Sequence, residues 1–67
     1  MKGNTMDEYL KGAIRCRLES VETVLEAEKK HRDKYERYSR LYYVFDNNVS
    51  YFEGKAKALR DMLELLG

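Results

Sequence analysis

A basic stretch interleaved with tyrosines, between Lys29 and Arg40, holds the side chains of this 67-residue chain best suited to chemistry. Basic groups can neutralise phosphates, and aromatic faces can stack on nucleic-acid bases. Residues 29–45 carry six basic and two acidic side chains, although the whole chain has a net charge of only +1. The candidates for contact with a nucleic acid or a partner protein are Lys29, Lys30, Arg32, Lys34, Arg37 and Arg40, with Tyr43 and Tyr51.

The same stretch has a second interpretation, as the solvated face of a helix. Asp33 precedes Arg37 by four residues, and Glu36 precedes Arg40 by four, which is the spacing and order that favours ion pairs along a helix. Nucleic-acid binders also tend to be more basic overall than this chain. We therefore predict a helix surface here, and keep nucleic-acid binding as the alternative.

One histidine, His31, and one cysteine, Cys16, offer little for catalysis or metal binding. The two residues are fifteen positions apart, about 22 Å along a helix, which is too far for a catalytic pair within the chain. The sequence has no glycine-rich phosphate loop and no pair of histidines. We predict no catalytic residue, no metal site, no cofactor and no enzymatic activity.

A regular row of apolar and aromatic residues, here called the seam, predicts the elements that hold these side chains. Steps of four and three residues from Leu10 to Leu66 meet seventeen positions, of which fourteen are apolar or aromatic. This period of 3.5 residues is typical of helices packed along a left-handed supercoil. The seam residues predicted to form an oligomer interface are Leu10, Ile14, Val21, Val24, Tyr35, Tyr38, Tyr42, Phe45, Phe52, Leu59, Leu63 and Leu66.

The expected fold is all-α, a single domain over residues 1–67 with a long helix over about 5–45 and a shorter helix over about 50–66. Asp46, Asn47 and Asn48 are poor helix formers, and Ser50 followed by Glu53 resembles a capping box. These residues predict a turn or a kink over 46–49. The seam keeps its phase through this segment, so both a turn and a kink remain open.

Self-association is predicted from the length, since a chain of this size buries only about 60% of its unfolded surface. No internal disulfide or zinc site can compensate for the small core. We expect coiled-coil or helical-hairpin packing completed by a homo-oligomer, with a dimer favoured. In an antiparallel pair centred on Tyr38, His31 of one chain meets Phe45 of the other.

The function predicted from these patterns is non-enzymatic protein binding. Tyr43, Tyr51, Leu41, Met62 and Leu65 lie off the seam, and extra apolar positions of this kind indicate a second protein interface. A purely structural coiled-coil module is a further alternative. No apolar run approaches a membrane span and no signal peptide precedes the helices, so we expect a soluble cytoplasmic protein without membrane contact.

The C-terminal quarter of the chain, Tyr51-Phe52-Glu53-Gly54-Lys55-Ala56-Lys57-Ala58-Leu59-Arg60-Asp61-Met62-Leu63-Glu64-Leu65-Leu66, resembles the ends of small helical proteins encoded by bacterial phages and prophages. The resemblance implies an accessory protein that acts by binding, for instance by blocking a host protein. It carries over no functional residue.

Overall fold

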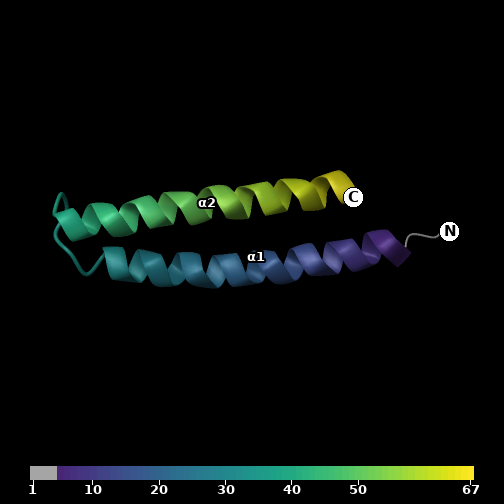
Figure 1. Ribbon diagram of the computed structural model, residues 1–67, viewed down its shortest axis with the longest axis horizontal. Helices are drawn as coiled ribbons and strands as arrows, with labels where there is room; N and C mark the ends of the chain where they lie inside the picture. The colour runs from purple at the N-terminus through teal and green to yellow at the C-terminus, as the bar shows by residue number, and fades with distance from the viewer. Residues whose placement is uncertain (1–4) are drawn as a thin grey trace.

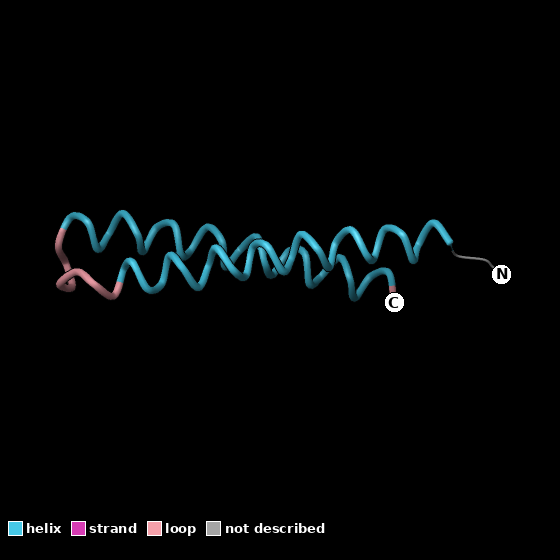
Figure 2. The backbone as a smooth tube through the Cα atoms, turned by 90° about the horizontal axis from the view of Figure 1, so that it is seen from below, coloured by secondary structure: helices cyan, strands magenta, loops and turns pink. Residues whose placement is uncertain are grey.

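Two helices joined by a short loop make up the computed structural model, which describes residues 5–67. Helix α1 spans Thr5–Arg32, helix α2 spans Arg40–Leu66, and residues 33–39 connect them. The helices lie side by side and antiparallel, as Figures 1 and 2 show from two directions. The N-terminal turns of α1 extend past the end of α2 (Figure 1). The predicted all-α fold with two packed helices is confirmed.

Local signals at the helix ends explain where each helix begins and stops. Asp7 and Glu8 lie in the first turn of α1, and its last turn is basic, so both ends carry charges that suit the helix dipole. Ser39 caps α2, because its hydroxyl accepts a hydrogen bond of 3.2 Å from the backbone N–H of Tyr42. Gly67 ends α2 with a φ of 87°, a conformation that glycine adopts readily.

The predicted helix boundaries are wrong in one respect. The first helix ends at Arg32 rather than near residue 45, and residues 46–49 lie inside α2. Asp46 accepts a hydrogen bond of 3.0 Å from Arg32, and the amide of Asn48 donates one of 3.3 Å to Glu28. Because Asp46 and Asn48 bond across to α1, tertiary contacts outweigh the weak helix propensity of this segment.

The core is a single layer of apolar side chains between the two helices. A cluster of Ile14, Val21, Ala56 and Leu59 is buried, and Leu18, Phe52, Leu63 and Leu66 pack against it. On α2 the core therefore follows the predicted seam. On α1 it keeps Ile14 and Val21 but takes Leu18 and Leu25 in place of the predicted Arg17 and Val24. Helix α1 is therefore turned about its axis relative to the prediction, so that the residues after Arg17 and Val24 enter the core.

This rotation leaves two predicted interface residues beside the core rather than inside it. Leu10 is 44% exposed and Val24 is 40% exposed. Their row runs along the side of α1 next to Ile14 and Val21, since residues three or four apart share one face of a helix.

One contact of the hairpin joins two residues that the sequence predicts to meet between two antiparallel chains. The rings of His31 and Phe45 lie 5.4 Å apart between their centroids, within one chain. The loop at 33–39 thus brings together, in a single molecule, a pair of residues expected to meet between two molecules.

We expect Leu59→Ala to lower the free energy of unfolding by about 2 kcal/mol or more, because it removes buried apolar volume from the core between α1 and α2. The matched control is Leu65→Ala in the same helix, where the side chain is 87% exposed. This control should change stability by less than about 0.5 kcal/mol. Urea titrations followed by circular dichroism measure both, and equal losses would contradict this core.

Candidate functional site

Exposed apolar side chains gather along one side of the hairpin, here called the apolar edge. On α1, the exposed residues Leu10 and Val24 lie beside the core residues Ile14 and Leu25. On α2, four large apolar side chains are exposed on the same side of the hairpin. The helical repeat places all six on the same side of the core layer. The residues of the apolar edge are Leu10, Val24, Leu41, Val44, Tyr51 and Met62.

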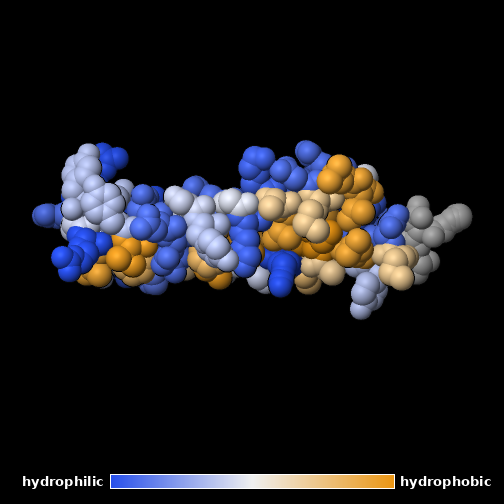
Figure 3. Space-filling view, turned by 45° about the horizontal axis from the view of Figure 1, so that its top comes forward, coloured by the Kyte–Doolittle hydropathy of each residue, from blue (hydrophilic) through white to orange (hydrophobic). Residues whose placement is uncertain are grey.

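The space-filling view shows how much hydrophobic surface the hairpin leaves uncovered. In Figure 3 hydrophobic residues are exposed over the half of the molecule where the start of α1 lies beside the end of α2. Surfaces of this kind mark sites of protein–protein contact more often than they mark small-molecule sites.

The opposite side of the hairpin is charged. Arg60 of α2 donates a hydrogen bond of 3.0 Å to Glu22 of α1. An open groove of about 490 Å³ follows the same side, lined by Leu25, Lys29, Glu53, Ala56, Lys57 and Arg60. The two sides of the hairpin therefore differ in chemistry, and only the apolar edge presents a surface that water solvates poorly.

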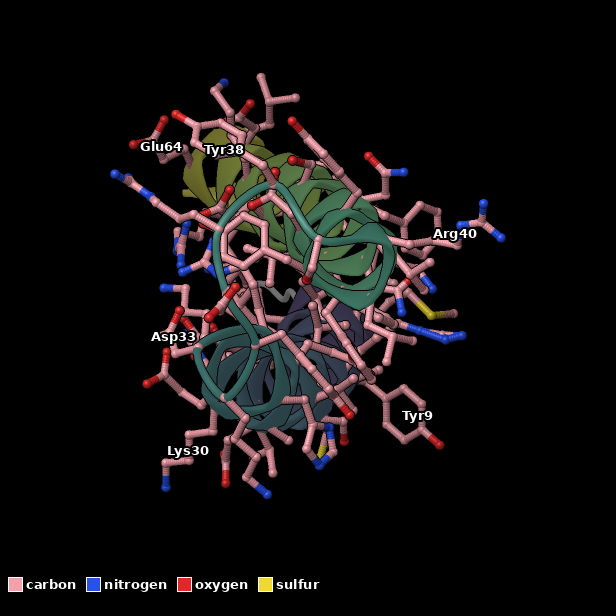
Figure 4. All side chains as sticks on the ribbon, turned by 90° about the vertical axis from the view of Figure 1, so that its left-hand side faces the viewer. Tyr9, Lys30, Asp33, Tyr38, Arg40 and Glu64 are labelled. Atoms are coloured by element: carbon pink, nitrogen blue, oxygen red, sulfur yellow. The ribbon has the colours of Figure 1, made fainter. Side chains whose placement is uncertain are left out.

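The predicted basic stretch forms the turn of the hairpin, here called the basic tip (residues 29–40). It combines the last turn of α1, the loop and the first residue of α2. Figure 4 views the molecule from this end and shows Lys30 and Arg40 extending outward on different sides. The basic side chains therefore spread around the tip.

Arg32 has a structural role within the basic tip. Its guanidinium donates to Asp46 at 3.0 Å and to Asp33 at 3.1 Å, and it lies 5.9 Å from the ring centre of Tyr42. The hydrogen bond to Asp46, and then the one to Asp33, raise the pKa of Arg32 above its usual value. These contacts tie the end of α1 to the second turn of α2.

The other basic residues divide into paired and unpaired groups. Lys29 lies 3.5 Å from Glu26. Within residues 5–67, no ion pair shorter than 4.0 Å involves Lys30, Lys34, Arg37 or Arg40, and all four are exposed. The predicted pairs Asp33–Arg37 and Glu36–Arg40 do not form in the described chain, because residues 33–39 are not helical.

The side chains of Tyr35 and Tyr38 in the basic tip are exposed in the hairpin, although both belong to the seam. Tyr38 is 77% exposed and lies beside Tyr43, with ring centroids 6.4 Å apart. Tyr35 is also exposed, although its ring stacks on that of Phe45 at 5.7 Å. Both tyrosines lie in the loop of the hairpin, and their place in an interface between chains stays a prediction.

His31 and Cys16 stay apart from one another and from other reactive groups. His31 packs against Phe45, and Cys16 is a free, exposed thiol on α1. Residues 5–67 contain no group of three histidine, cysteine, aspartate or glutamate side chains placed to hold a metal ion. Neither α1 nor α2 is long and apolar enough to cross a membrane.

Comparison with protein-family models, with curated proteins and with solved structures gives no match for this chain. Its function is therefore argued from its two surfaces, the apolar edge and the basic tip.

We expect Arg32→Ala to lower the urea midpoint of unfolding, because it removes the contacts that join the two helices at the tip. The control is Lys57→Ala, which breaks a bond of 3.0 Å to Asp61 within one turn of α2, where both side chains are more exposed. Exposed pairs of this type contribute little. A control that destabilises as much as Arg32→Ala would contradict the structural role of Arg32.

Proposed function

We propose that this chain is a non-enzymatic protein-binding hairpin that self-associates through its apolar edge. The observation that carries the proposal is the row of exposed apolar side chains on one side of the hairpin, opposite a charged side. Covering such a row with the apolar surface of another helix removes it from water, at roughly 25 cal/mol per Å² of apolar area.

A second copy of the chain is the occupant that this surface fits best. Only six residues within the described range 6–67 are buried, all of them apolar. Two helices with so small a core are marginal by themselves, and two hairpins that share their apolar edges would build a four-helix arrangement with a larger core. The same patch would serve on both copies, as in most homodimers.

The resemblance of residues 51–66 to ends of small phage-encoded helical proteins supports a further step of the proposal. On this basis the hairpin acts in the bacterial cytoplasm as an accessory protein that binds and blocks a host protein. A purely structural oligomerisation module is the alternative, and it differs in having no partner other than its own copies.

We expect Val24→Lys combined with Met62→Lys to convert the dimer to monomer, because two charges would have to be buried at the apolar edge. Both side chains are already partly exposed in the hairpin, so the helical content should change little. Sedimentation velocity measures the association, and circular dichroism measures the helix content.

The matched control is Glu19→Lys, a charge change at an exposed position of α1 outside the apolar edge. It should leave the association unchanged. The same variants can be used as bait with bacterial lysate, where a partner of the apolar edge should bind the native chain and the control but not the edge variant. An edge variant that dimerises like the native chain would refute the proposal.

Nucleic-acid binding by the basic tip is the second candidate, and one observation favours it. Lys30, Lys34, Arg37 and Arg40 are exposed without ion-pair partners among residues 5–67, and Tyr38 in the same segment is exposed too. The divergence of Lys30 and Arg40 in Figure 4 opposes it, because a phosphate backbone must meet several charges at once.

We expect binding to duplex DNA and to RNA to be weaker than about 1 μM at physiological salt, in the range typical of non-specific contact. Fluorescence anisotropy over a series of salt concentrations tests this expectation. Four neutralised phosphates would give a log–log salt slope of about −3.6 on duplex DNA. Sub-micromolar binding with that slope, lost in Lys34→Gln with Arg37→Gln, would make nucleic-acid binding the better assignment.

A further inference from the structure

The loop of the hairpin holds an unfavourable backbone conformation at Tyr38. Its φ of 70° is the only positive value at a residue other than glycine within the described chain. Side chains with a Cβ rarely adopt this region, because the Cβ crowds the neighbouring carbonyl oxygen. Loop residues 33–39 include no glycine, asparagine or proline. The loop therefore closes the hairpin with strain at a bulky residue.

The first three loop residues nevertheless continue the hydrogen bonding of α1 as turns. The N–H of Asp33 donates to the carbonyl of Lys29 at 3.0 Å, as in an α-helix. The N–H groups of Lys34 and Tyr35 donate to carbonyls three residues earlier, at 3.2 and 3.1 Å. The chain thus reverses over residues 36–38, and a hinge of a few residues can absorb a large change in direction.

The helical repeat of the sequence continues through this loop. One row of residues spaced seven apart comprises Ile14, Val21, Glu28, Tyr35, Tyr42, Val49, Ala56 and Leu63. Its members Ile14, Val21, Val49 and Ala56 are buried between the two helices. Tyr35 falls on this seven-residue repeat although it lies in the loop. A loop that only reversed the chain would not need a length that preserves the seven-residue repeat.

Two contacts near the tip join residues that are equally far from Tyr38 along the chain. His31 and Phe45, whose rings are in contact, are each seven residues from Tyr38. Glu28 and Asn48, joined by a hydrogen bond, are each ten residues away. If one continuous helix paired antiparallel with a copy of itself around Tyr38, a two-fold axis would bring the same residues together between chains.

We propose that residues 36–38 are a hinge, and that two chains open into single helices over residues 5–66 and exchange halves to form an antiparallel dimer. Helix α1 of each chain then packs against α2 of the second copy in the register of the hairpin. Opening removes the positive φ of Tyr38 and lets Asp33 pair with Arg37, and Glu36 with Arg40, along a helix. Mass action favours the exchanged dimer at high concentration.

This exchange goes beyond the proposed function, because it reuses the core of the hairpin and does not require the apolar edge. It predicts a change in the distance between two points of one chain. Positions 19 and 57 lie on α1 and α2, which pack against each other in the hairpin. In one continuous helix, 38 residues would separate them by about 57 Å.

The test places spin labels on Glu19→Cys and Lys57→Cys in a Cys16→Ser background. The doubly labelled chain is diluted in excess unlabelled chain, so that pulsed electron paramagnetic resonance reports distances within one chain. We expect a short distance at low concentration, and a growing fraction near 57 Å as the dimer forms.

Two variants of the hinge should move this equilibrium in opposite directions. Tyr38→Gly relieves the strain of the closed loop and should raise the dimer dissociation constant by roughly 30-fold, since relief occurs in both chains. Tyr38→Ala is its control, because it keeps the Cβ and should leave the dimer at least as stable. Removing residues 33–39, one whole heptad, abolishes the hinge without shifting the repeat and should give only the long-helix dimer.

The possible results separate this inference from the proposed function. A concentration-dependent population near 57 Å that Tyr38→Gly suppresses and Tyr38→Ala retains supports the hinge. A dimer in which every labelled chain keeps the short distance overturns the hinge and leaves association through the apolar edge intact. A chain that stays monomeric with the short distance at every concentration overturns both.

Discussion

The whole structure depends on one layer of apolar contact between two helices. Ile14 and Val21 of α1 meet Ala56 and Leu59 of α2, and Ala56 has no exposed surface. A small residue at the centre of the layer lets the two helix backbones approach closely. Because a pair of helices has only one shared face, no second core compensates when this layer is weakened. The size of the layer also explains why surfaces outside it are the natural places for further association.

The polar contacts at the turn fix where α2 begins and how the two helices are aligned, and they lie outside the apolar core. Ser39 starts α2 by capping it, and Arg32 ties the end of α1 to Asp46 and Tyr42. Glu28 and Asn48 add a hydrogen bond one turn away from the tip. These side chains form hydrogen bonds with each other between the helices, so no charge is buried without a partner among them. They therefore stabilise the register of the two helices at a small desolvation penalty.

The two candidate surfaces follow from how each helix is rotated against the other. Because α1 uses Leu18 and Leu25 in its core, Leu10 and Val24 face outward on one side, next to the apolar residues of α2. The tip is basic because the end of α1 gathers lysine and arginine where the helix dipole favours them. An apolar edge fits another helix, and a tip with spread charges fits a nucleic acid less well.

The sequence alone determined that the chain is helical and which residues of α2 face the core. Both features follow from local periodicity, which can be read from the order of residues. The rings of His31 and Phe45, predicted to meet between two chains, meet within one chain.

Only the tertiary structure decided where the chain turns and which face of α1 is buried. The cluster Asp46–Asn48 predicts a break by propensity, yet it stays helical, and the side chains of Asp46 and Asn48 bond to α1. The loop at residues 33–39 has few turn residues, and its position is set by Ser39, Arg32 and the fit of two distant core rows. Contacts between residues far apart in the chain contribute more free energy than a few local preferences, and periodicity alone does not reveal them.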